Sequence, residues 1–256
     1  MESLINSKNP LAAFNAPFFL SLIDDVKWRD TFGKFIQYAF RTSVAFLPDL
    51  SIADKQTRLA TAETLNTAAG HISLGRRLFR FMRWTRNLHN YISDIKSYNP
   101  TAVGIVHASA SIAACICEDI TTLGKLGLIP AHFSDQFIMP GNYCWLTESV
   151  SGFIIHGLRL REASVKLLNT RKLYQTTKAG ESDPNLVYTQ KQSYLKALVA
   201  LHMAQVNFTK WVCEVMAASH DSKFHSNTKL ALISSLISAF VSTYSHSTKF
   251  LPKETY

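Results

Sequence analysis

The sequence contains few helix-breaking and few charged residues. Its 256 residues include only 10 Gly and 8 Pro, and no stretch of useful length alternates apolar with polar residues. Because half-buried strands need such alternation, the sequence predicts an all-α protein. Charged residues make up 18 % of the chain, against about 25 % in a typical soluble domain. With a mean hydropathy of +0.02, this composition indicates either a large core or a surface that faces lipid.

Cysteine is also scarce, and its pattern argues against a metal centre. The four cysteines have neither a Cys-x-x-Cys pair nor a histidine at metal-ligand spacing: Cys115, Cys117, Cys144 and Cys213. We expect buried free thiols in a reducing compartment. A secretory signal is not expected either, because Asn15 and Pro17 interrupt the first apolar run, residues 10–23. The carboxyl-terminal residues LPKETY are not an import tripeptide.

Enzyme motifs are absent from the sequence. No nucleophile elbow, P-loop or dinucleotide-binding glycine motif occurs. Glu118 and Asp119 are adjacent carboxylates, which a polar helix end explains better than acid/base catalysis. The histidines that stand out by context have no ligand partners at a suitable spacing, namely His107, His132, His220 and His225. The sequence therefore predicts a non-enzyme without catalytic residues, metal or cofactor.

Apolar residues at three- and four-residue spacing predict a helical organisation along the whole chain. We expect an N-terminal region, 1–98, and a helical membrane-associated region, 99–256. The expected helices cover 24–47, 61–97, 145–174 and 187–218, with loops over 127–142 and 176–185. Residues 102–117 and 230–245 are two further runs of sixteen without a charged side chain. Both are shorter than the roughly 18 to 20 residues of a clear spanning helix, so each suits a core helix or a membrane segment. We expect one or two membrane-embedded segments.

Positive charge is concentrated in one part of the chain. The net charge is +9, and residues 76–100 contribute +5 of it through six basic residues and one acidic residue. A local basic block of this kind indicates an anionic partner, either nucleic acid or phospholipid headgroups. No zinc-finger spacing or other nucleic-acid motif accompanies it, and we therefore expect no nucleic-acid partner.

The basic block has the pattern of an amphipathic helix over about 66–95. Apolar residues share one broad arc, arginines lie opposite, Arg77 and Trp84 lie at the boundary, and Phe79 departs from the pattern. Two interpretations remain: a helix packed on a core with a solvated basic face, or a helix that binds an anionic phospholipid membrane. The two uncharged runs favour the membrane. The expected membrane-binding residues are Leu74, Arg76, Arg77, Leu78, Arg80, Phe81, Met82, Arg83, Trp84, Arg86, Leu88 and Ile92.

Four segments, in this order, resemble the peroxisomal biogenesis factor 11 family. They are WRDTFGKFIQYAFR (28–41), AETLNTAAGHISLGRRLFRFMRW (62–84), ICEDITTLGKLGLI (116–129) and LALISSLISAF (230–240). The resemblance implies a protein of the peroxisomal membrane, or of its glycosomal relative, that elongates the membrane before fission and so controls organelle number and size. It also implies a fission adaptor and a dynamin-related GTPase as partners. We further expect homo-oligomers, formed through the Ser- and Ala-rich helices.

Two other functions remain open from the sequence. A pore for small metabolites would use the serines of the two uncharged runs, namely Ser109, Ser111, Ser234, Ser235 and Ser238. A soluble helical interaction module is the second alternative. If both runs cross the membrane, the two termini lie on one side, and the basic helix places that side in the cytosol.

Overall fold

The computed structural model describes residues 25–47, 55–97, 101–180 and 184–248. These residues form helices and no strands, which confirms the all-α fold. The apolar run 10–23 and the carboxyl-terminal LPKETY lie outside the described residues. The helices are α3 (Val26–Phe46), α4 (Lys55–Arg80), α5 (Arg83–Ser97), α6 (Ala102–Lys125), α7 (Ala131–Asp135), α8 (Ile138–Ala179), α9 (Pro184–Asp221) and α10 (Thr228–Ser247).

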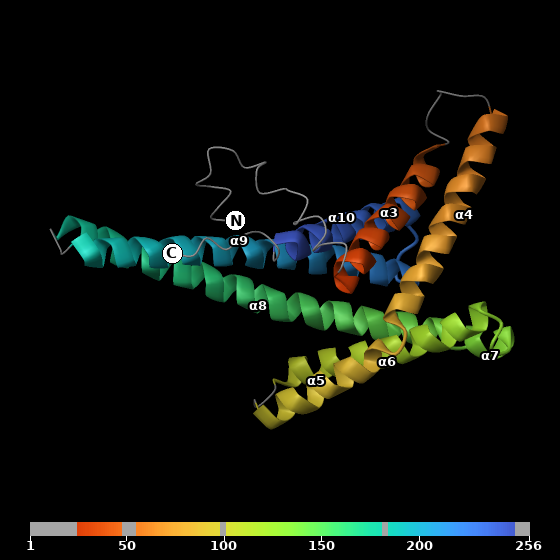
Figure 1. Ribbon diagram of the computed structural model, residues 1–256, viewed down its shortest axis with the longest axis horizontal. Coiled ribbons are helices and arrows are strands. Elements are labelled where there is room, and N and C mark those ends of the chain that lie inside the picture. Colours follow the sequence, from red (N-terminus) through yellow and green to blue (C-terminus); the bar gives the residue numbers. More distant parts are fainter. Residues whose placement is uncertain (1–24, 48–54, 98–100, 181–183, 249–256) are drawn as a thin grey trace.

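Two long helices, α8 and α9, form the spine of the molecule (Figure 1). Helix α10 packs on α9 and on α3, and α4 packs on α3. On the other side of the spine, α6 packs on α8, and α5 packs on α6. Side chains cap the starts of three helices, because Asp25, Thr101 and Asn227 each accept a backbone N–H from the first turn of α3, α6 and α10.

The expected helix over 61–97 is not continuous, and this prediction was wrong. Helix α4 ends at Arg80, α5 begins at Arg83, and Met82 between them has a φ of 57°. A residue with a side chain rarely adopts this left-handed conformation. The contact that stabilises the break comes from elsewhere in the fold, since Asp119 Oδ2 accepts the Met82 backbone N–H at 2.9 Å. Local spacing therefore could not reveal it.

Two expected loops are shorter than predicted. Residues 127–142 contain α7 and the start of α8, whose first turn holds Pro140, a position where a missing N–H costs little. At the other end, α8 continues to Ala179. The apolar run 102–117 belongs to α6, which extends to Lys125 and is, among the described helices, the only one long and apolar enough to cross a membrane. The run 230–245 lies within α10.

The packing of the bundle places small and polar side chains inside. Among the described residues, the buried apolar side chains are Ala69, Ala110, Cys115, Ala197, Ala217, Ala218, Ala231 and Ala239. Large apolar side chains are exposed along α6, α8, α9 and α10. Soluble domains normally show the reverse. Small residues between helices and large apolar residues outside are typical of helices that pack in a bilayer or against other chains.

Candidate membrane-binding surface and basic cleft

The end of α4 and the start of α5 expose a cluster of large apolar side chains. Leu78, Phe79, Phe81 and Met82 are 40 % to 58 % exposed, and Leu88 and Ile92 continue the exposed series along α5. We call these six residues the junction surface. Five of them were predicted from the sequence. Phe79 was missed because a continuous helix places it on the polar side, whereas it is exposed here with the Arg29 guanidinium 5.7 Å from its ring centre.

The other predicted residues do not all lie at the surface. Leu74 and Trp84 are half-buried, Arg86 is exposed, and Arg77, Arg80 and Arg83 are partly buried. Arg76 is buried outright. The predicted basic face, expected to point at lipid headgroups, therefore points largely into the bundle.

Arg76 joins α4 to α3 through charged and polar contacts. Its Nε donates to Asp30 Oδ1 and to the Asp30 carbonyl, both at 3.0 Å, and its Nη1 donates to Gln37 Oε1 at 2.7 Å. Gly33 makes room for this side chain, since a Cβ there would lie 3.1 Å from Arg76 Cδ. A buried guanidinium is stable only with such partners, because desolvation otherwise outweighs its interactions.

The remaining arginines connect α4 and α5 to α6. Arg80 Nη2 donates to Glu118 Oε1 at 2.7 Å, and Arg83 Nη2 contacts Cys115 Sγ at 3.4 Å. Arg77 Nη1 donates to Thr121 Oγ1 at 3.3 Å. Glu118 and Asp119, which the sequence suggested as a polar helix end, thus bind the α4–α5 junction from the middle of α6.

These arginines line one cleft of about 730 Å³ between α3, α4, α5, α6, α8 and α9. Ten Lys or Arg side chains line it, against five Asp or Glu side chains. Helix α3 contributes a polar stripe at helical spacing that includes Asp30, Lys34, Gln37 and Arg41. A cleft with an excess of one charge concentrates ions of the opposite charge, so this one favours anions. We call it the basic cleft.

At the base of the cleft, a buried carboxylate joins three helices. Glu214 of α9 accepts hydrogen bonds from Lys34 of α3 and Ser238 of α10. Burial would raise the pKa of Glu214, but the charges of Lys34 and Lys210 outweigh it and lower the pKa to about 2. Burial lowers the pKa of Lys210, whose ammonium lies over the Trp211 ring. The sequence did not identify these residues, because isolated charges on amphipathic helices usually face solvent.

The histidines take structural positions. His107 Nδ1 lies 3.0 Å from the Glu148 carbonyl, and its ring meets Trp211 edge-on. The His156 ring stacks on the ring of the same tryptophan. Burial, followed by the charge of Arg159, lowers the pKa of His156 to about 4. In the described part of the chain, no three His, Cys, Asp or Glu side chains form a group suited to a metal ion.

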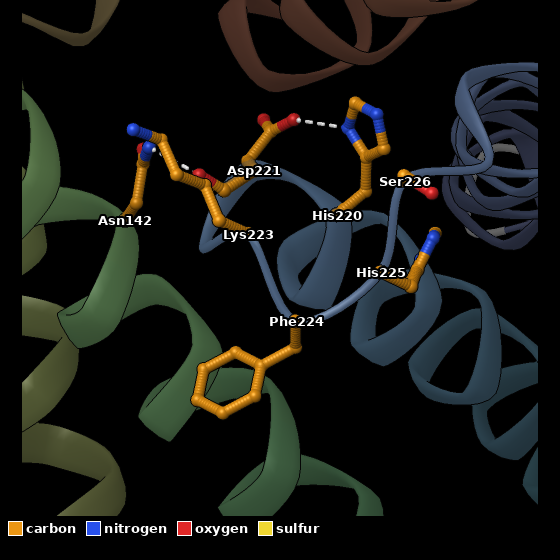
Figure 2. Close-up of a pocket in the computed structure, with 7 residues that line it drawn as sticks. All are labelled: Asn142, His220, Asp221, Lys223, Phe224, His225 and Ser226. Atoms are coloured by element: carbon orange, nitrogen blue, oxygen red, sulfur yellow. Dashed lines mark hydrogen bonds and ion pairs between the residues drawn. The ribbon is translucent and has the colours of Figure 1, made fainter.

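The connector between α9 and α10 forms a second, open pocket of about 720 Å³ (Figure 2). His220 Nδ1 lies 3.1 Å from Asp221 Oδ1, and Asn142 of α8 donates to the Asp221 carbonyl at 2.8 Å. His225 Nε2 lies 2.9 Å from the Met216 carbonyl. The connector is therefore held to α8 and α9, and His220 and His225 are both partly buried.

The serines considered as a pore lining belong to separate interfaces. Ser234, Ser235 and Ser238 are buried in α10, which packs on α9 and α3. Ser109 and Ser111 lie on α6, where Ser109 is exposed and Ser111 accepts a hydrogen bond from Asn87 of α5. The described residues therefore do not bring the two groups together around one passage.

The match to a family model decides what kind of protein this is. The model of peroxisomal biogenesis factor 11 matches residues 19–246, nearly the whole chain. The chain belongs to the peroxisomal biogenesis factor 11 family. Neither a curated protein nor a solved structure matches it. Membership gives the chain a role in peroxisome biogenesis and associates it with the peroxisomal membrane.

The peroxisomal biogenesis factor 11 resemblance drawn from the sequence is thus confirmed. Its four segments lie in α3, in α4 and the α4–α5 junction, at the end of α6 and the turn after it, and in α10. The family is one of biogenesis factors and is not known for enzymes.

Proposed function

We propose that this chain bends the peroxisomal membrane by inserting the junction surface into the cytosolic leaflet. The observation that supports this is the cluster of exposed Leu, Phe and Met side chains at the α4–α5 break. Apolar side chains that enter one leaflet expand it relative to the other and so favour curvature. A break that exposes adjacent side chains concentrates this effect at one point.

Apolar burial supplies most of the binding free energy in this proposal. Full burial of a Leu, Phe or Met side chain contributes about 1.5 to 3 kcal/mol. Leu78, Phe79, Phe81 and Met82 are each about half exposed, so burying their exposed parts contributes roughly 3 to 6 kcal/mol in all. An arginine near an anionic surface adds about 1 kcal/mol. Because Arg76 and Arg80 are engaged with Asp30 and Glu118, fewer arginines contribute than the sequence suggested.

The pairing of α5 with α6 indicates how these two helices are oriented relative to the bilayer. Arg83 and Asn87 of α5 contact Cys115 and Ser111 of α6, and the two helices run side by side (Figure 1). A charged helix in the middle of a bilayer is costly. We therefore propose that α5 and α6 remain paired and lie along the membrane surface beside the junction surface.

The test uses the full-length protein and anionic vesicles. Leu78→Glu with Phe81→Glu should weaken vesicle binding at least about tenfold and abolish tubulation, because charge replaces inserted apolar area. The matched control is Leu59→Glu, at the other end of α4, where the side chain is 62 % exposed. Equal tubulation by the double variant and the wild type would refute the proposal, as would equal loss in the control.

A further inference from the structure

Three of the ten cations that line the basic cleft form ion pairs with nearby carboxylates, and three others gather at one end of it. Arg76, Arg80 and Lys34 form ion pairs with Asp30, Glu118 and Glu214. At the end of the cleft near α7, by contrast, Arg41, Arg77 and Lys125 form no ion pair within the described part of the chain. They come from three different helices: α3, α4 and α6.

Arg41 and Arg77 both act on the charge of Lys125. The charges of Arg77 and Arg41 both repel the Lys125 ammonium, and the nearby carboxylates that attract it, Asp135 and Glu118, form no ion pair with it. Among the described residues, Arg77 donates to the neutral Thr121 hydroxyl, one helical turn before Lys125 on α6, and Arg41 lies over the Tyr38 ring. The fold thus brings three positive charges to one end of the cleft, and none of them forms an ion pair within the described residues. A bound anion would relieve the repulsion of Lys125 by Arg41 and Arg77.

We propose that the Arg41, Arg77 and Lys125 end of the basic cleft binds a phosphate-bearing anion. Two arginines can each present a planar pair of N–H donors to phosphate oxygens, and the lysine adds a point charge. A phosphate monoester carries close to two negative charges at neutral pH, which three cations match better than they match a single carboxylate. The cleft volume of about 730 Å³ lies within the range of small-molecule sites.

Two sources could supply this phosphate group, a lipid headgroup or a soluble phosphate ester. Arg77 lies one helical turn before the end of α4, next to the junction surface, and this position connects the site to a headgroup in an adjacent leaflet. The inference goes beyond membrane bending and does not depend on it, because anion binding in detergent requires no bilayer.

The experiment measures binding of inorganic pyrophosphate to the full-length protein in a neutral detergent. Binding should raise the melting temperature, and sodium chloride at equal ionic strength should not. Arg77→Gln and Lys125→Gln should each weaken pyrophosphate binding about tenfold, the effect of losing one charged hydrogen bond. Arg171→Gln removes the same charge from an exposed position of α8 that does not line the cleft, and it should leave binding unchanged. Circular dichroism checks that each variant remains helical.

A second experiment tests whether a lipid headgroup or a soluble ester supplies the phosphate group. It compares flotation of the protein with phosphatidylcholine vesicles that contain or lack phosphatidylinositol phosphate. Stronger flotation with the phosphoinositide, competed by pyrophosphate and reduced by Arg77→Gln, assigns the site to a headgroup. Pyrophosphate binding without that preference assigns it to a soluble ester. The proposal is overturned if neither probe binds, if sodium chloride reproduces the shift, or if Arg171→Gln weakens binding as much as Arg77→Gln does. Retained pyrophosphate binding in the Leu78→Glu, Phe81→Glu variant separates this site from the bending surface.

Discussion

Arg76 is the residue whose environment differs most from the sequence-based expectation, and it gives a direct test of the packing. Arg76→Gln removes the ion pair with Asp30 at 3.0 Å and leaves that carboxylate only its longer contact with Arg80, at 3.5 Å. Breaking a buried pair in this way costs about 3 kcal/mol of unfolding free energy. Arg86→Gln is the matched control: Arg86 is exposed, and its substitution should change stability by less than about 0.5 kcal/mol. Denaturant titration followed by circular dichroism measures both, and equal stability of the two variants would contradict the buried position of Arg76.

Glu214 makes the stability of the bundle depend on acid. Its pKa in the folded chain, about 2, lies below its ordinary value of 4.5, so the ionised carboxylate stabilises the folded state above about pH 4.5. This stabilisation is lost as the pH falls from about 4.5 towards 2. Glu214→Gln should be less stable at neutral pH and should show a flatter decline in melting temperature over that interval. An unchanged pH profile in the variant would show that the carboxylate is not held by Lys34 and Lys210.

At the scale of the helix, two glycines on α8 test how closely it packs on α9. A Cβ at Gly152 would lie 2.6 Å from the Trp211 ring, whereas one at Gly157 would lie 3.5 Å from Phe208, an ordinary contact. Gly152→Ala should therefore destabilise the protein by about 1 to 3 kcal/mol through overpacking. Gly157→Ala should be neutral or stabilising by up to about 1 kcal/mol, because alanine favours helix. Thermal unfolding measures the stability of both variants. A Gly152→Ala variant as stable as the wild type would contradict the close contact between α8 and Trp211.

For the whole molecule, the pairing of α5 with α6 predicts the topology. If α5 and α6 lie together along the surface and α10 stays packed on α9 and α3, the chain does not cross the bilayer, and both ends stay in the cytosol. Epitope tags placed before Met1 and after Tyr256 should both be digested by protease added to intact peroxisomes. A single crossing by α6 would place the ends on opposite sides. Protection of one tag would therefore contradict this arrangement.

Several features followed from the sequence alone, because they depend on local periodicity and composition. Helical spacing and the scarcity of Gly and Pro determined the all-α fold, and the four motifs determined the family. Five of the six residues of the junction surface are among those that the sequence predicted to bind the membrane, and the structure exposes all five.

The tertiary structure decided what the arginines contact. Periodicity places Arg76, Arg80 and Arg83 on one face of a helix but does not tell whether that face meets solvent, lipid or protein. Their partners, Asp30, Glu118 and Cys115, lie 46, 38 and 32 residues away in the chain. The Met82 break likewise depends on Asp119, 37 residues away. Contacts over such separations arise only when helices pack, and so the basic cleft belongs to the fold and not to any one segment of the sequence.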